Sequence, residues 1–151
     1  AYATQSEAGD SGLDYDTDYH LLEVGAKLGP VGLTGGYEVL GADNGIGFST
    51  PFATGHKFQG WADRFLSTPG DGIEDLYVGA SGKLGPLELA AVYHDFQAED
   101  SGEDFGDEID LVATWPVNEH FTTELKYAAF SADGDTYTDT DKVWLTLQLK
   151  L

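Results

Sequence analysis

The residues best suited to bind a solute lie in one long segment, over residues 42–72. His56, Lys57 and Arg64 supply positive charge in a chain that has 27 acidic residues and only 7 lysines and arginines. Trp61 adds an aromatic side chain to this group, and positive charge favours the binding of an anionic solute. The alternative is an outer cap, whose aromatic side chains pack on neighbouring strands while its bases neutralise nearby acids.

A second set of candidate ligands is acidic. Closely spaced aspartates over residues 133–141 offer the oxygen ligands that calcium prefers, but their spacing does not match an EF-hand loop. A solvated acidic rim is the simpler interpretation, and a weak site for calcium, or for calcium that bridges to lipopolysaccharide phosphates, is the alternative. The aspartates in question are Asp133, Asp135, Asp139 and Asp141.

Catalytic motifs are missing from the sequence. His94 stands beside Asp95, and Ser81 lies upstream. The residue types of a catalytic triad are therefore present, but no motif indicates that they come together. The sequence contains no Gly-x-Ser-x-Gly elbow, no His-Glu-x-x-His and no phosphate-binding loop. We therefore expect neither an enzyme nor a cofactor, and we expect His94 to form hydrogen bonds in a polar interior.

The composition excludes several classes of protein. The 151 residues carry a formal charge of −20, and a surface this acidic repels nucleic acid. The chain has no cysteine, which excludes disulfides, thiolate metal sites and thiol catalysis. No run approaches the ~18 apolar residues of a transmembrane helix, although membrane β-strands give a much weaker signal.

Apolar and polar residues alternate along most of the chain, which predicts β-strands with one apolar face. The clearest case is the end of the chain, where Val143, Leu145 and Leu147 alternate with Trp144 and Thr146. A weaker candidate strand lies at about residues 1–8. The seven strong strands are expected over residues 21–28, 31–39, 76–84, 87–94, 108–115, 124–129 and 142–151.

The connections between these strands are alternately short and long. Gly-Pro turns repeat at residues 28–31 and 84–87, and a third short turn lies at 116–119. The long connections are expected at about residues 9–14, 42–72, 97–106 and 132–141. In an up-and-down meander this places every short turn at one end and every long loop at the other, as in outer-membrane barrels. Thr50 and Pro51 also favour a short helix over residues 53–66.

The charged side chains of the strands fall on the face opposite the apolar one. In a membrane barrel the apolar face meets lipid and the polar face lines the lumen; a soluble acidic barrel or sandwich would reverse this. In a wide barrel the polar face tunes solute selection, and in a small one Lys126 would form ion pairs beside Glu124 and Glu108. The expected lumen-lining residues are Glu23, Glu38, Glu88, His94, Glu108, Asp110, Glu124 and Lys126.

One long stretch carries a family resemblance. Residues 47–66 read GFSTPFATGHKFQGWADRFL, and further matching pieces are 72–77 (GIEDLY), 92–96 (VYHDF), 125–128 (LKYA) and 142–145 (KVWL). In this order they resemble the C-terminal half of porin-like barrels related to the bacterial alginate-export family. The resemblance implies a Gram-negative outer-membrane channel of roughly sixteen or more strands. The arginine-rich uronate path of that family is absent, since Arg64 is the only arginine, so alginate is not implied as the solute.

The sequence thus predicts an all-β, antiparallel, up-and-down transmembrane β-barrel of eight strands. Residues 1–151 are expected to form either one barrel domain or the C-terminal part of a larger barrel, with residues 42–72 as an extracellular or constriction loop. The predicted function is a channel in the bacterial outer membrane for small polar or anionic solutes. The alternatives are a non-conducting barrel with a structural or adhesive role and a soluble acidic ligand-binding barrel. Expected partners are outer-membrane lipid and lipopolysaccharide and a small polar solute, with either further copies in a homo-oligomer or a missing N-terminal part of the barrel.

Overall fold

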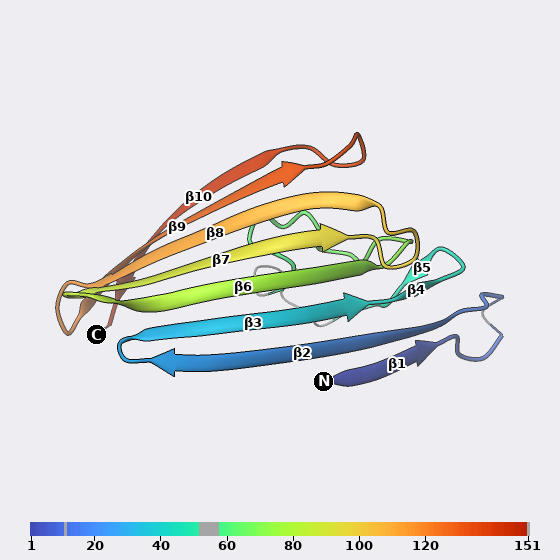
Figure 1. Ribbon diagram of the computed structural model, residues 1–151, viewed down its shortest axis with the longest axis horizontal. Helices are drawn as coiled ribbons and strands as arrows, with labels where there is room; N and C mark the ends of the chain where they lie inside the picture. Colours follow the sequence, from blue (N-terminus) through green and yellow to red (C-terminus); the bar gives the residue numbers. More distant parts are fainter. Residues whose placement is uncertain (11, 52–57, 151) are drawn as a thin grey trace.

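A computed structural model describes residues 1–10, 12–51 and 58–150 of the chain. Eight strands form one antiparallel sheet in the order β1-β2-β3-β6-β7-β8-β9-β10, and β4 and β5 form a separate small hairpin (Figure 1). No helix among the described residues is long and apolar enough to cross a membrane. The strands are β1 Tyr2–Ser6, β2 Asp16–Leu28, β3 Val31–Leu40, β4 Ala42–Asp43, β5 Ile46–Gly47, β6 Ile73–Leu84, β7 Leu87–Gln97, β8 Asp104–Pro116, β9 Phe121–Ala132 and β10 Thr140–Leu149.

All eight strands predicted from alternation are confirmed, and their neighbours in the sheet follow the order of the chain. The two Gly-Pro turns are confirmed as well. Gly29 and Gly85 have φ of 62° and 59°, the positive value that a two-residue type II′ hairpin turn takes at its first central position. The β4–β5 hairpin was not predicted, although its Asn44-Gly45 turn is a strong hairpin signal.

The expected closed barrel is wrong for this chain, because the sheet is open. β1 and β10 are its two edges and do not pair with each other. β1 pairs with β2 over five residues only, whereas β10 pairs with β9 over ten. Closing a sheet into a barrel requires its strands to tilt and stagger until the first and last strands meet, and β1 and β10 do not meet here.

The short helix expected over residues 53–66 is also absent where the structure describes that segment, at residues 58–66. Gln59, Gly60 and Asp63 have φ of 54°, 77° and 56° there. These left-handed values do not fit a right-handed helix. The segment is an irregular loop, which Figure 1 shows behind the sheet.

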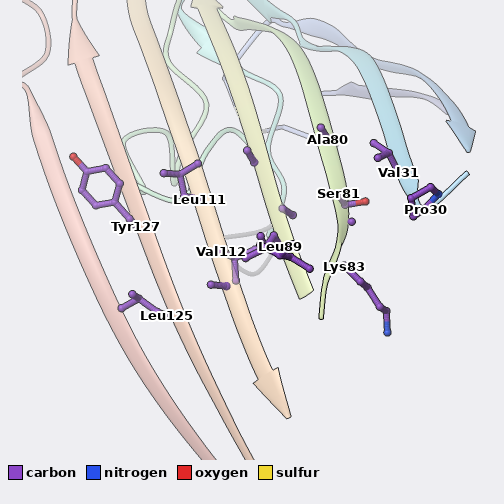
Figure 2. A pocket seen from close by; sticks show the side chains of 15 residues that line it. Pro30, Val31, Ala80, Ser81, Lys83, Leu89, Leu111, Val112, Leu125 and Tyr127 are labelled. Atoms are coloured by element: carbon purple, nitrogen blue, oxygen red, sulfur yellow. The ribbon is translucent and has the colours of Figure 1, made fainter. Parts of the chain in front are cut away.

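The two faces of the sheet differ sharply. We call the face toward segment 58–66 the inner face and the opposite one the outer face. The outer face is apolar and exposed: Leu22, Val78 and Leu145 expose 69%, 57% and 65% of their surface. A hollow of about 590 Å³ indents it, and Figure 2 shows side chains from several neighbouring strands around this hollow. Its apolar lining includes Val31, Leu89, Leu111, Leu125 and Tyr127.

The buried core lies on the inner face, at the end of the sheet that carries the long loops. Phe65 of the loop segment sits among the rings of Phe96, Phe105, Phe130 and Tyr137, with centroid separations from 4.8 to 5.8 Å. Aromatic contacts at these distances add stability beyond the burial of area. The core therefore fastens the loop to the sheet, as expected for a cap that packs its aromatic side chains on neighbouring strands.

Candidate functional site

Buried carboxylates gather on the inner face next to this aromatic core. The register places Glu38 of β3 opposite Asp75 of β6, and His94 of β7 opposite Glu108 of β8. Asp110 follows Glu108 by two residues and so points to the same face. Glu38, Asp75, Glu108 and Asp110 expose at most 2% of their surface, and His94 exposes 8%. Burial of so many ionisable groups requires hydrogen-bond partners.

Segment 58–66 supplies several of those partners through its backbone. The amide of Ala62 donates to Oε1 of Glu108 at 2.7 Å, and the amide of Trp61 donates to Oδ2 of Asp110 at 3.1 Å. Gly60 makes this approach feasible, because a Cβ there would lie 2.5 Å from Oε2 of Glu108. The backbone thus fits against the two carboxylates, and a side chain at position 60 would collide with them.

A histidine and an aspartate form the centre of the cluster. Nδ1 of His94 lies 3.0 Å from both carboxylate oxygens of Asp75, and Nε2 lies 3.8 Å from Oδ2 of Asp110. The imidazole also stacks on Phe96, with 5.5 Å between ring centroids and 9° between planes. His94 therefore takes its partner from the neighbouring strand; it does not pair with Asp95, which points to the outer face.

A cavity of about 330 Å³ opens beside this cluster. Carboxylates of β2, β3 and β6 line it from the sheet, and the loop segment covers it from the other side. No lysine or arginine is among its described lining residues. The chemically relevant lining residues are Glu23, Glu38, Phe58, Gln59, Trp61, Asp75, Tyr77 and His94.

The expected cationic group of residues 42–72 is only partly placed at this site. Trp61 lines the cavity, but His56 and Lys57 lie outside the described residues. Arg64 is not part of the cavity lining. Burial raises the pKa of the Tyr137 hydroxyl, in the loop between β9 and β10, and the positive charge of Arg64 partly offsets this effect by lowering that pKa.

Three expected lumen-lining residues lie outside the buried cluster and the cavity, and they form local pairs on the inner face. They are Glu88, Glu124 and Lys126. Glu88 pairs with Lys83, and Lys126 lies 3.9 Å from Glu124. The ammonium of Lys126 also lies 4.8 Å from the ring centroid of Trp61, within cation–π range. The expected pairing of Lys126 with Glu124 is present. Glu108, by contrast, takes the amide of Ala62 as its partner.

Several residues of the site escaped prediction. Asp75 and Tyr77 occupy odd-numbered positions of β6, and the side chains at these positions point to the inner face. Strand alternation alone could therefore have identified them. Tyr19 and Gln59 both donate to Glu38, at 2.7 and 2.6 Å. No local pattern indicates these two contacts, because they join residues 19 and 21 positions apart.

The acidic loop aspartates show no metal geometry. Across residues 1–10, 12–51 and 58–150, no three histidine or acidic side chains are grouped so as to hold a metal ion. Asp139 accepts the amide of Ala132 at 2.9 Å, and Asp141 accepts the hydroxyl of Tyr127. Both therefore serve as local hydrogen-bond acceptors at the base of the β9–β10 loop.

Comparison of the chain with protein-family models, with curated proteins and with solved structures finds no significant match. The two faces of the sheet and the cavity are therefore the features that bear on function.

Proposed function

We propose that this chain forms part of the wall of a porin-like channel in the bacterial outer membrane, through which small polar solutes pass passively. One observation carries the proposal: the aliphatic side chains of the sheet are exposed while carboxylates on the opposite face are buried. Ile109 and Leu147 expose 45% and 62% of their surface, whereas the neighbouring Glu108 exposes none.

This arrangement is unfavourable in water and favourable in a lipid bilayer. Contiguous apolar patches of more than a few hundred Å² are rare on soluble monomers, and the outer face presents one across β2, β3 and β6 to β10. A hydrocarbon layer removes that surface from water at no cost to the inner face. Tyr37, Tyr93 and Trp115 are exposed on the same outer face, as the interfacial aromatic residues of membrane barrels are.

The loop segment 58–66 supports a channel with a constriction. It lies on the inner face, it is held to the sheet by Glu108 and Asp110, and Trp61 projects to the cavity. A segment folded inward in this way narrows the aqueous path and places side chains where a solute passes. The resemblance to alginate-export porins supports the same assignment.

The open sheet supports a larger barrel over a self-contained one. Both edges, β1 and β10, have a partner on one side only, and a strand edge in lipid leaves backbone groups without hydrogen bonds. Further strands must therefore pair with both edges in the membrane. A second copy of the chain would supply them when this chain is the only protein present.

The test is conductance in a planar lipid bilayer after refolding in detergent. We expect discrete, ohmic channels, and we expect W61A to raise their conductance because the indole narrows the path. W115A serves as the control, since Trp115 lies on the outer face, and it should conduct like the wild type. A protein that stays monodisperse without detergent would contradict membrane insertion and favour a soluble ligand-binding protein. Insertion without conductance would favour a structural or adhesive barrel.

A further inference from the structure

The inner-face cavity is lined by carboxylates from three strands, together with the neutral hydroxyls of Thr34 and Ser81. Its volume of about 330 Å³ lies at the small end of ligand pockets, which span about 300–1,000 Å³. Glu23, Glu38 and Asp75 line it as carboxylates, with no lysine or arginine beside them in the described lining. These carboxylates favour a ligand that supplies positive charge or hydrogen-bond donors.

Three donors near these carboxylates already form hydrogen bonds within the protein. Tyr19 and Gln59 donate to the two oxygens of Glu38 at 2.7 and 2.6 Å. The hydroxyl of Tyr77 donates to Oε2 of Glu23 at 2.6 Å. Each carboxylate oxygen still has a further lone pair for a ligand. The hydroxyls of Tyr19 and Tyr77 have used their only protons, and Gln59 has used one of its two amide N–H groups.

His94 adds a buried polar atom that a ligand in this cavity can use. Its side chain is nine-tenths buried and lines the cavity, and Nδ1 is engaged by Asp75 at 3.0 Å. Nε2 forms no hydrogen bond with the described residues; its nearest charged neighbour is Asp110, at 3.8 Å. Nε2 is therefore the polar atom of the ring whose hydrogen-bonding capacity is left for a ligand.

We propose that this cavity binds a small organic cation with N–H donors, of the ammonium or guanidinium class. The carboxylates supply charge-assisted hydrogen bonds, and the rings of Trp61 and Tyr77 supply faces that attract cations. Trp61 already takes the ammonium of Lys126 at 4.8 Å. This assigns to the site a solute opposite in charge to the anion expected from the bases of segment 42–72. Its role as a transit site rests on the proposed channel; binding itself does not.

Calorimetric titration of the refolded full chain in detergent tests the binding. We expect agmatine to bind, and both tetramethylammonium, which lacks N–H donors, and glutarate, an anion, to bind at least about tenfold more weakly. D75N and E23Q should each weaken agmatine binding about tenfold. E88Q is the control, since Glu88 is paired with Lys83 outside the cavity, and should bind like the wild type.

Glu23 is exposed, so E23Q keeps the test valid if the buried Asp75→Asn substitution prevents folding. Absence of agmatine binding, equal binding of tetramethylammonium, or unchanged binding by E23Q would each overturn the inference. Agmatine block of single channels separates this result from the proposed function. Conductance without agmatine binding would leave the channel standing and remove the cation site. Binding without conductance would leave the site standing and remove the channel.

Discussion

Gly60 sets how closely the loop approaches the sheet. Its φ of 77° lies in the left-handed region, and the position that a Cβ would occupy is 2.5 to 2.7 Å from the carboxylate atoms of Glu108. Both conditions disfavour other residues, the first through backbone strain and the second through collision. This one residue therefore permits the amides of Trp61 and Ala62 to reach Asp110 and Glu108.

The substitution G60A is predicted to loosen the loop. We expect it to reduce the free energy of unfolding in detergent by about 1–3 kcal/mol more than G45A does. Gly45 is the matched control, because its φ is 76° and no atom lies within 4 Å of the added Cβ. Urea unfolding of both variants measures the difference. Equal losses would show that backbone strain alone matters and that the loop does not rest on Glu108.

Tyr137 is predicted to make the loop contacts sensitive to alkaline pH. Burial raises its pKa above the ordinary value of about 10, so the folded state holds the phenol proton more tightly than the unfolded state. Its contribution to stability is therefore complete below pH ~10 and declines as the pH rises through the raised pKa. Unfolding at pH 9 and pH 11 should show a larger loss for the wild type than for Y137F; parallel losses would contradict this.

At the scale of the element, each strand of the sheet separates two environments by alternation. Leu111 and Val112 are adjacent in β8 but point to opposite faces, the first exposed on the outer face and the second half-buried on the inner face. Strand geometry requires this, because successive side chains project to opposite sides. If the outer face meets lipid, neighbouring substitutions in one strand should have very different effects.

Arginine at these two positions tests that expectation. L111R should cost roughly 2–4 kcal/mol of folding stability in lipid vesicles, as cations on the lipid-facing side of membrane strands do. V112R should cost less, because its guanidinium would stay on the polar inner side, even with Lys126 directly opposite in β9. Folding yield in vesicles measures both. Equal tolerance of the two substitutions would show that the outer face does not contact hydrocarbon.

At the scale of the whole molecule, the open sheet leaves one side of β10 without a partner strand. In an antiparallel edge strand, alternate backbone amides point away from the neighbouring strand. For the chain alone in detergent, we expect every second amide of β10 to exchange at least about a hundredfold faster than the amides of β8, which lies between β7 and β9. Amide exchange by NMR measures this. Uniform protection along β10 would mean that another strand pairs with it.

The sequence by itself determined the strands, their order and the faces to which their side chains point. These features are local: alternation needs only neighbouring residues, and the turns at Gly29 and Gly85 need only a residue that accepts positive φ. Glu108 and Glu124 could be placed on the inner face because successive side chains of a strand point to opposite faces. The same alternation would have placed Asp75 there.

Only the tertiary structure decided which distant residues meet and whether the sheet closes. Ala62 donates to Glu108 across 46 positions, and His94 meets Asp75 across 19. Whether β1 and β10 join depends on the tilt and stagger of all the strands between them. Such contacts depend on how the chain packs in space, and no spacing along the chain encodes them. For the same reason, the bases of residues 42–72 suggested an anion, while the cavity beside Trp61 is lined by carboxylates.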